Sequence, residues 1–181
     1  MKLLLTSTGF SNPKLGQRFL RMAGKPAAEI RALFIPTAAI EPDAIDMLPA
    51  CLGDLRGLGI PDAHIRVCDL HQPVTAAELD DIDAVYVCGG STAYLLQRVN
   101  EAGFGEALRT FLARGGVYVG VSAGSVIAAQ NLPHNLGYVP CQLNVHCAQG
   151  SPDGPLGERT AIDLTNEQAI VIDGASVAIV S

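Results

Sequence analysis

Residues 118–127, YVGVSAGSVI, pass from an apolar run through a serine flanked by small residues and back into apolar sequence. Gly120, Ser122 and Gly124 form the pattern G-x-S-x-G. A sharp turn from a strand into a helix needs small residues on both sides, so that the backbone closes and the serine hydroxyl stays exposed. The alternative is that Ser122 only caps a helix or forms a tight turn. A strand-like run before it and a helix-compatible run after it favour a nucleophile.

Outward from this stretch, short apolar runs alternate with segments of helical period. Unpatterned apolar runs are typical of strands that are covered on both faces. The alternation predicts an α/β fold, with an open, mostly parallel sheet and helices on both sides. The expected strands are residues 2–7, 31–36, 63–68, 83–90 and 116–122. The expected helices contain the stripe Leu48, Leu52 and Leu55, with a late start because of Pro49, the capping-box pair Thr75 and Glu78, and the apolar series from Leu95 to Leu112.

The pattern changes after Gly124. Residues 141–146, 168–173 and 176–181 are strand-like, and the last two flank Gly174. Residues 168–173 and 176–181 predict a hairpin at the edge of the sheet. The loop of residues 147–159 is rich in Gly and Pro and is expected to be exposed.

Composition narrows the class of protein. The chain has 181 residues, as expected of a single domain (1–181), and it is 49% apolar with a net charge of -6. No basic run, signal-like segment or long apolar stretch is present, so we expect neither nucleic acid nor a membrane as a partner. Five cysteines without a CxxC motif indicate reduced thiols and a cytoplasmic protein. No metal-ligand spacing is visible, and we expect no cofactor.

A serine nucleophile needs a base and an acid that orients the base. His146 ends a strand-like run beside the Gly/Pro-rich loop and is preferred, with His134 in reserve. Asp173 ends the apolar run AIVID and is the preferred acid. The other histidines, His64 and His71, lie upstream, and the other acids considered are Asp153, Glu158 and Asp163.

Residues 87–96, VCGGSTAYLL, form a second glycine-containing junction between a strand and a helix. Such a loop can hold a phosphate, but the Walker lysine and the G-x-G-x-x-G spacing are absent. Beside Ser122, another role fits better. The N–H groups of Gly90 and Ala123 are expected to form an oxyanion hole.

With these residues in place, the chain resembles the peptidase E family, serine dipeptidases related to cyanophycinase. The resemblance extends over essentially the whole chain. The motifs that match are the glycine loop with Ser91 and Thr92, the elbow around Ser122, the Asn144-x-His146 strand end, the pair Gly157 and Glu158, and the pair Asp173 and Gly174.

The resemblance implies a flavodoxin-like sheet and a triad of Ser122, His146 and Asp173. It implies an Asp-Xaa dipeptidase that acts through an acyl-enzyme, with substrate contacts from Ser91, Glu158 and Arg159. Family enzymes have Glu as the third member and place their arginine one position later than Arg159.

The segment before His146 is also shorter than in those enzymes. We therefore expect a more open pocket, or one completed in a homodimer. The alternatives are a related esterase, an isoaspartyl or cyanophycin-type peptidase, and a non-catalytic flavodoxin-like module that binds an anion.

Overall fold

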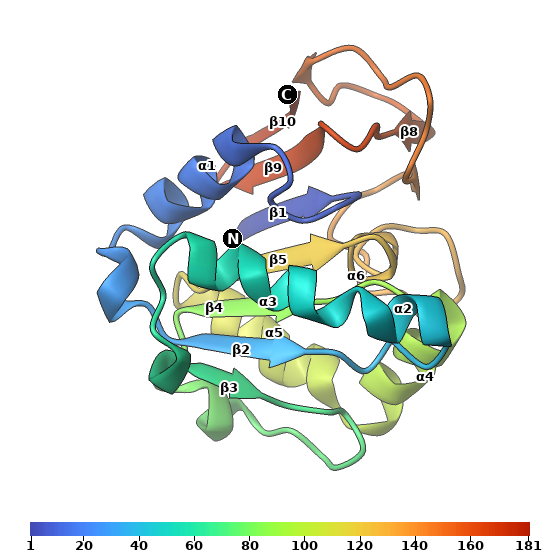
Figure 1. The fold of residues 1–181 in the computed structure, drawn as a ribbon. Helices are drawn as coiled ribbons and strands as arrows, with labels where there is room; N and C mark the ends of the chain where they lie inside the picture. Colours follow the sequence, from blue (N-terminus) through green and yellow to red (C-terminus); the bar gives the residue numbers. More distant parts are fainter.

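The computed structural model describes all residues, 1–181, and contains one large and one small sheet. The large sheet has eight strands in the order β3-β2-β4-β5-β1-β9-β10-β7 (Figure 1). The five strands from β3 to β1 are parallel to one another. The next three strands, β9, β10 and β7, are each antiparallel to the strand before them in this order. The strands are β1 (Lys2–Thr6), β2 (Ala32–Ile35), β3 (Ile65–Val67), β4 (Ala84–Val87), β5 (Val117–Val121), β7 (Gly154–Pro155), β9 (Ala169–Asp173) and β10 (Ser176–Val180).

Helices cover both faces of this sheet, which confirms the predicted flavodoxin-like α/β class (Figure 1). The helices are α1 (Pro13–Ala23), α2 (Pro42–Asp46), α3 (Leu48–Gly57), α4 (Thr92–Glu101), α5 (Phe104–Ala113) and the single turn α6 (Ala123–Val126). Three short 3-10 turns are η1 (Ala27–Glu29), η2 (Asp62–His64) and η3 (Ala76–Leu79).

Two apolar layers hold the helices against the sheet. Phe19 of α1 and Leu55 of α3 are fully buried in the layer on one face. Leu95 of α4 and Phe111 of α5 are fully buried in the layer on the other face. Because both faces are covered, the central strands are apolar throughout and show no alternation with polar residues.

Three helical expectations need adjustment. Helix α3 begins at Leu48 and not late, because Pro49 lies in the first turn, where its missing N–H is not needed. The capping box of Thr75 and Glu78 is present, but it begins only the 3-10 turn η3. Helix α1 was not anticipated, although Asn12 and Pro13 are typical of a helix start.

The C-terminal strands form the predicted hairpin, with Gly174 at φ 62° in its turn. The direction of β9 has a consequence for the site. Ala169 pairs with Thr6 and Asp173 pairs with Lys2, so β9 begins where β1 ends. A separate small sheet is formed by the parallel strands β6 (Gln142–Asn144) and β8 (Ala161–Asp163).

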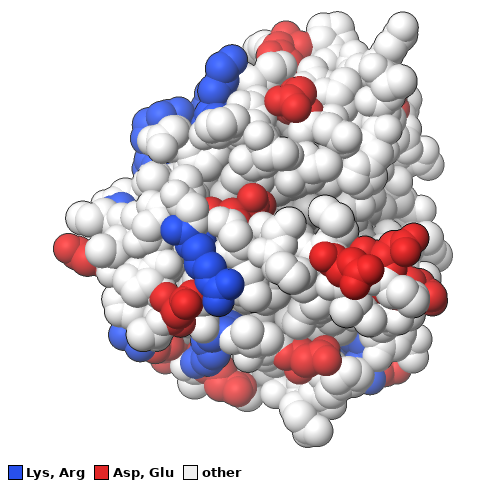
Figure 2. All heavy atoms as spheres, in the orientation of Figure 1, with Lys and Arg blue, Asp and Glu red and all other residues white.

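All five cysteines are free thiols, of which Cys88 and Cys141 are buried. No helix has both the length and the apolar character that crossing a membrane requires. On the face shown in Figure 2, basic side chains lie over α1 and the C-terminal part of α3, and a group of acidic side chains lies near α2.

Asn12 connects α1 to the segment before β9 and offers a test of this packing. Its Oδ1 accepts from the Lys14 N–H, and its Nδ2 donates to the Glu167 carbonyl at 2.9 Å. Losing the cap costs about 1 kcal/mol, and losing the second bond costs a similar amount. We expect Asn12→Ala to lower the free energy of unfolding in urea by about 2 kcal/mol, and Asn12→Ser, which keeps only the cap, by about 1 kcal/mol. Equal losses in both variants would show that the cap contributes nothing.

Candidate active site

Ser122 lies at the sharp turn between β5 and α6. Its backbone has φ 48° and ψ -108°, a conformation that L-residues rarely adopt. A Cβ on Gly120 would lie 2.6 Å from the Gly124 carbonyl oxygen, and one on Gly124 would lie 2.4 Å from the Val87 oxygen. The two glycines of the G-x-S-x-G pattern are therefore required by close backbone contacts. Ser122 itself remains partly exposed.

Buried hydrogen bonds hold this turn in place. The Ser125 hydroxyl lies 2.7 Å from the Thr6 carbonyl oxygen and 2.8 Å from that of Gly120. The Tyr118 hydroxyl donates to the Gly124 carbonyl at 2.6 Å. These contacts offset the strain at Ser122, because a strained backbone persists only where its surroundings determine it.

His146 reaches Ser122 from the loop after β6. Its Nε2 lies 3.0 Å from the Ser122 Oγ. The His146 N–H donates to the Ser7 hydroxyl at 3.1 Å, and that hydroxyl donates to the Leu164 carbonyl at 3.3 Å. Ser7 directly follows β1, so the carboxyl end of that strand positions the histidine.

The other imidazole nitrogen is occupied by Asn166. The Asn166 Oδ1 lies 3.0 Å from Nδ1 of His146. An amide oxygen can only accept, so this contact places the proton on Nδ1 and leaves Nε2 free to accept from the Ser122 hydroxyl. The Asn166 carbonyl accepts from the Thr8 hydroxyl at 2.8 Å, which anchors the residue to the loop after β1.

The expectation that Asp173 orients His146 is corrected by this arrangement. Asp173 pairs with Lys2 at the start of β1, whereas Ser122 and His146 lie at the other end of that strand. Five residues of extended chain span roughly 16 Å, too far for a hydrogen bond. The error came from the strand direction: β9 is antiparallel to β1, so its first residue, not its last, is nearest the site.

The glycine loop after β4 lies beside Ser122. A Cβ on Gly89 would lie 3.0 Å from the Ser122 Cβ, and one on Gly90 would lie 2.1 Å from the Ala38 carbonyl oxygen. Gly90 also has φ 134°, so a larger residue would not fit there. The N–H groups of Gly90 and Ala123 donate to no protein acceptor. Both expected donors are therefore unpaired within the protein.

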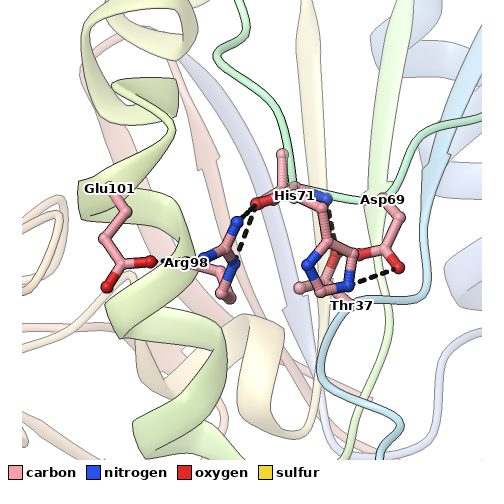
Figure 3. A network of polar contacts seen from close by, with 6 residues as sticks. Thr37, Asp69, His71, Arg98 and Glu101 are labelled. Atoms are coloured by element: carbon pink, nitrogen blue, oxygen red, sulfur yellow. Dashed lines mark hydrogen bonds and ion pairs between the residues drawn. The ribbon is translucent and has the colours of Figure 1, made fainter.

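A polar network joins the loops after β2 and β3 to helix α4 (Figure 3). The Thr37 hydroxyl donates to Asp69 at 2.7 Å, and Asp69 contacts His71 at 3.0 Å. Arg98 of α4 binds the Leu70 carbonyl through two nitrogens and also pairs with Glu101. The loops after β2 and β3 are thus tied to the helix that begins at the glycine loop. His71 belongs to this network and is remote from Ser122.

A cavity of about 540 Å³ opens beside Ser122. Of the three substrate contacts that the resemblance implies, none lines it. Ser91 caps α4, with its hydroxyl accepting from the Tyr94 N–H at 3.4 Å. Glu158 and Arg159 precede β8, whereas the site lies beyond the end of that strand. The lining includes Ser7, Thr8, Gly89, Gly90, Ser122, His146, Asn166, Glu167, Asp54, Cys51, Cys88 and apolar residues of α2 and α3.

Asp54 lies at the inner part of this cavity. Its Oδ2 accepts from the Tyr86 hydroxyl at 2.6 Å and from the Phe10 N–H at 2.8 Å. Burial raises the pKa of the Asp54 carboxyl, although both hydrogen bonds oppose that rise. Cys51 and Cys88 lie next to it, and the hydrogen bond between the two thiols lowers the pKa of Cys51 and raises that of Cys88.

Sequence reasoning missed Asn166 and Asp54. Asn166 stands in a polar turn, TNEQ, which has no catalytic pattern. Asp54 lies on a helix whose leucine stripe indicated only packing. A signal existed for Asn166 alone: it lies three residues before strand β9, and an antiparallel strand in that place begins at the edge of the sheet where Ser122 lies.

Asp54 makes stability depend on pH in a defined direction. Because its pKa is raised in the folded protein, its contribution favours folding at low pH and is lost as pH rises through the raised value. We therefore expect Asp54→Asn to gain stability relative to the wild type between pH 4 and pH 8, measured by urea unfolding. Asp46→Asn, on exposed α2, controls for the loss of one charge. A constant difference between Asp54→Asn and wild type would contradict the buried carboxylate.

Comparison with known proteins agrees with the expected resemblance. Residues 3–139 match the profile of Peptidase family S51. A peptidase E of Streptomyces coelicolor is 31% identical over 166 residues, which cover 83% of this chain and 65% of that protein. An uncharacterized peptidase of Listeria innocua is 33% identical over 101 residues, which cover 56% of this chain and 48% of that protein. The matched part thus spans about half to two thirds of these relatives.

Solved structures show the same fold. A crystal structure of a candidate peptidase E protein from Listeria monocytogenes superposes with a TM-score of 0.72 at 24% identity, covering 99% of this chain and 97% of that one. A peptidase from an acI-B1 actinobacterium gives a TM-score of 0.65 at 16% identity, with 99% and 87% covered. Because the family profile matches more than half of the sequence, this chain belongs to Peptidase family S51, with the peptidase E proteins that it resembles.

Proposed function

We propose that this peptidase is of the serine type and hydrolyses dipeptides or short peptides through an acyl-enzyme. The observation behind the proposal is the 3.0 Å contact between the Ser122 hydroxyl and Nε2 of His146, with Asn166 on Nδ1. A nucleophile, a base and a residue that orients the base are the parts that acyl transfer requires.

The reaction follows from these contacts. The Ser122 Oγ attacks the scissile carbonyl carbon while its proton passes to Nε2 of His146. The oxyanion accepts from the N–H groups of Gly90 and Ala123, each contributing about 3 kcal/mol to lowering the barrier. The imidazolium then protonates the leaving amine, and the C–N bond breaks. Water, deprotonated by His146, attacks the ester, and Ser122 regains its proton as the acid leaves.

Asn166 performs only part of the task of an acid. Its amide oxygen holds the imidazole in the required tautomer and orientation. It brings no negative charge to the imidazolium that forms during the reaction, whereas a carboxylate would. The proposed triad is therefore Ser122, His146 and Asn166, with an orienting but uncharged third member.

The aspartyl preference implied by the resemblance is not part of this proposal. The resemblance assigns recognition of the substrate carboxylate to Arg159, and Arg159 does not line the cavity. An esterase with the same catalytic residues remains the alternative among hydrolases. The alternative from another class is an anion-binding module that uses the free N–H of Gly90.

Replacing the nucleophile separates these functions. Ser122→Ala should abolish cleavage of dipeptides and covalent labelling by a fluorophosphonate, while far-UV circular dichroism stays native. Wild-type protein that takes up no label would favour the anion-binding module. Faster turnover of simple esters than of any peptide would favour the esterase.

Replacing Asn166 tests how His146 is oriented. Asn166→Ala should lower kcat by about 10- to 100-fold, because a misplaced imidazole loses alignment with Ser122. Asn166→Asp keeps the acceptor and adds a charge that favours the imidazolium, so its kcat should equal or exceed that of the wild type. If Asn166→Ala retained full kcat, orientation by this residue would be refuted.

A further inference from the structure

We propose that Asp54 forms a subsite for a protonated amine on the acyl side of the substrate, so that this enzyme prefers cationic peptides over those with an N-terminal aspartate. The inference deepens the proposed function and rests on it. It assigns a specificity role to a residue that takes no part in the chemistry at Ser122.

The charges that line the cavity point to a cationic ligand. Asp54 and Glu167 are its carboxylates, and no Lys or Arg lines it. An anionic substrate side chain would meet repulsion from both acids and would find no partner. A cation would meet attraction from both, and water screens the charge of half-buried Asp54 less than it screens that of exposed Glu167.

Asp54 has an acceptor left over for such a ligand. Both of its hydrogen bonds, from Tyr86 and Phe10, end on Oδ2. No protein donor bonds to Oδ1, and Asp54 forms no ion pair. Burial disfavours the ionised carboxylate and raises the pKa of Asp54, and a bound ammonium would offset that cost. The side chain is thus held in place by Oδ2 and open to a ligand at Oδ1.

The position of Asp54 limits where the amine lies on the substrate. Gly89 packs against Ser122, Cys88 directly precedes Gly89, and Cys51, which is hydrogen-bonded to Cys88, lies one helical turn before Asp54. The chain of neighbours from Ser122 to Asp54 thus runs through Gly89, Cys88 and Cys51, which all line the cavity. The amine that reaches Asp54 is several bonds from the scissile carbonyl, as in the side chain of a lysine or the α-amine of a flexible N-terminal residue.

The α2–α3 segment also gives the cavity an apolar part that suits the rest of such a substrate. This part consists of Ala44, Met47 and Leu48, and Met47 is 58% exposed. A group of acidic side chains lies in the region of α2 (Figure 2). Glu41, Asp43 and Asp46 are exposed there, so the field at the entrance also attracts cations.

Four dipeptides test the proposal and identify the source of the amine. Leu-Leu has only the α-amine, N-acetyl-Lys-Leu only the side-chain amine, and N-acetyl-Leu-Leu neither. Asp-Leu adds a carboxylate to the α-amine. We expect Leu-Leu or N-acetyl-Lys-Leu, or both, to exceed N-acetyl-Leu-Leu in kcat/KM by about tenfold or more, which is the gain that a charge-assisted hydrogen bond allows. Asp-Leu should be poorer than Leu-Leu.

Asp54→Asn should reduce the preference for the cationic dipeptide to below about threefold, because an amide oxygen can accept a hydrogen bond from an ammonium but carries no charge to strengthen it. Asp46→Asn removes one exposed acidic charge near the entrance without touching the cavity, so it should lower the preference by less than about twofold. Equal turnover of all four dipeptides, or an unchanged preference in Asp54→Asn, would overturn the proposal.

Binding provides a readout that needs neither turnover nor the variant. Calorimetry on the wild type should detect leucinamide or N-acetyl-lysinamide binding at least about tenfold tighter than N-acetyl-leucinamide. Equal affinities would refute the amine subsite even if the protein were not a peptidase. If the protein bound the amines more tightly than N-acetyl-leucinamide but took up no fluorophosphonate, only the proposed serine chemistry would be rejected.

Discussion

The position of β1 between β5 and β9 determines where the site forms. β5 runs parallel to β1 and β9 runs antiparallel to it. The end of β5, the end of β1 and the beginning of β9 therefore meet at one edge of the sheet. Ser122 follows the first of these, Ser7 the second, and Asn166 precedes the third. The parallel and the antiparallel neighbour of β1 thus bring together the proposed nucleophile, the residue that supports His146 and the residue bonded to its Nδ1.

Close backbone packing at this edge explains the small residues there. Gly120 and Gly124 let the turn at Ser122 close against β4, and Gly90 lets the neighbouring loop pass over Ala38. Each glycine removes a side chain from a place where another backbone lies within van der Waals distance. The same contacts leave the N–H groups of Gly90 and Ala123 without protein acceptors beside Ser122. The close backbone packing that requires these glycines thus also produces the proposed oxyanion hole.

Local patterns in the sequence were sufficient for part of this site. The turn around Ser122, the glycine loop and His146 at a strand end were all predictable, because each depends on a few neighbouring residues. The parallel strands and helices α4 and α5 were predictable from apolar runs and helical period. Asp173 was assigned wrongly because strand direction depends on pairing between residues far apart in the chain. Arg159 was misplaced for a related reason, since its distance from the site depends on the pairing of β6 and β8.

Asp54 illustrates what sequence patterns do not reveal. Its neighbours on α3 indicate only a helix that packs through leucines, yet its carboxylate faces the cavity, supported by Tyr86 and Phe10. A half-buried acid with one oxygen unpaired destabilises the folded protein when it is ionised. An amide at this position could make similar hydrogen bonds without that cost, so packing alone does not account for a carboxylate. In the proposed reaction, Ser122 and His146 act at the carbonyl and are indifferent to charge several bonds away. On that proposal, selection among peptides comes from groups such as Asp54, which lie in the same cavity but outside the chemistry.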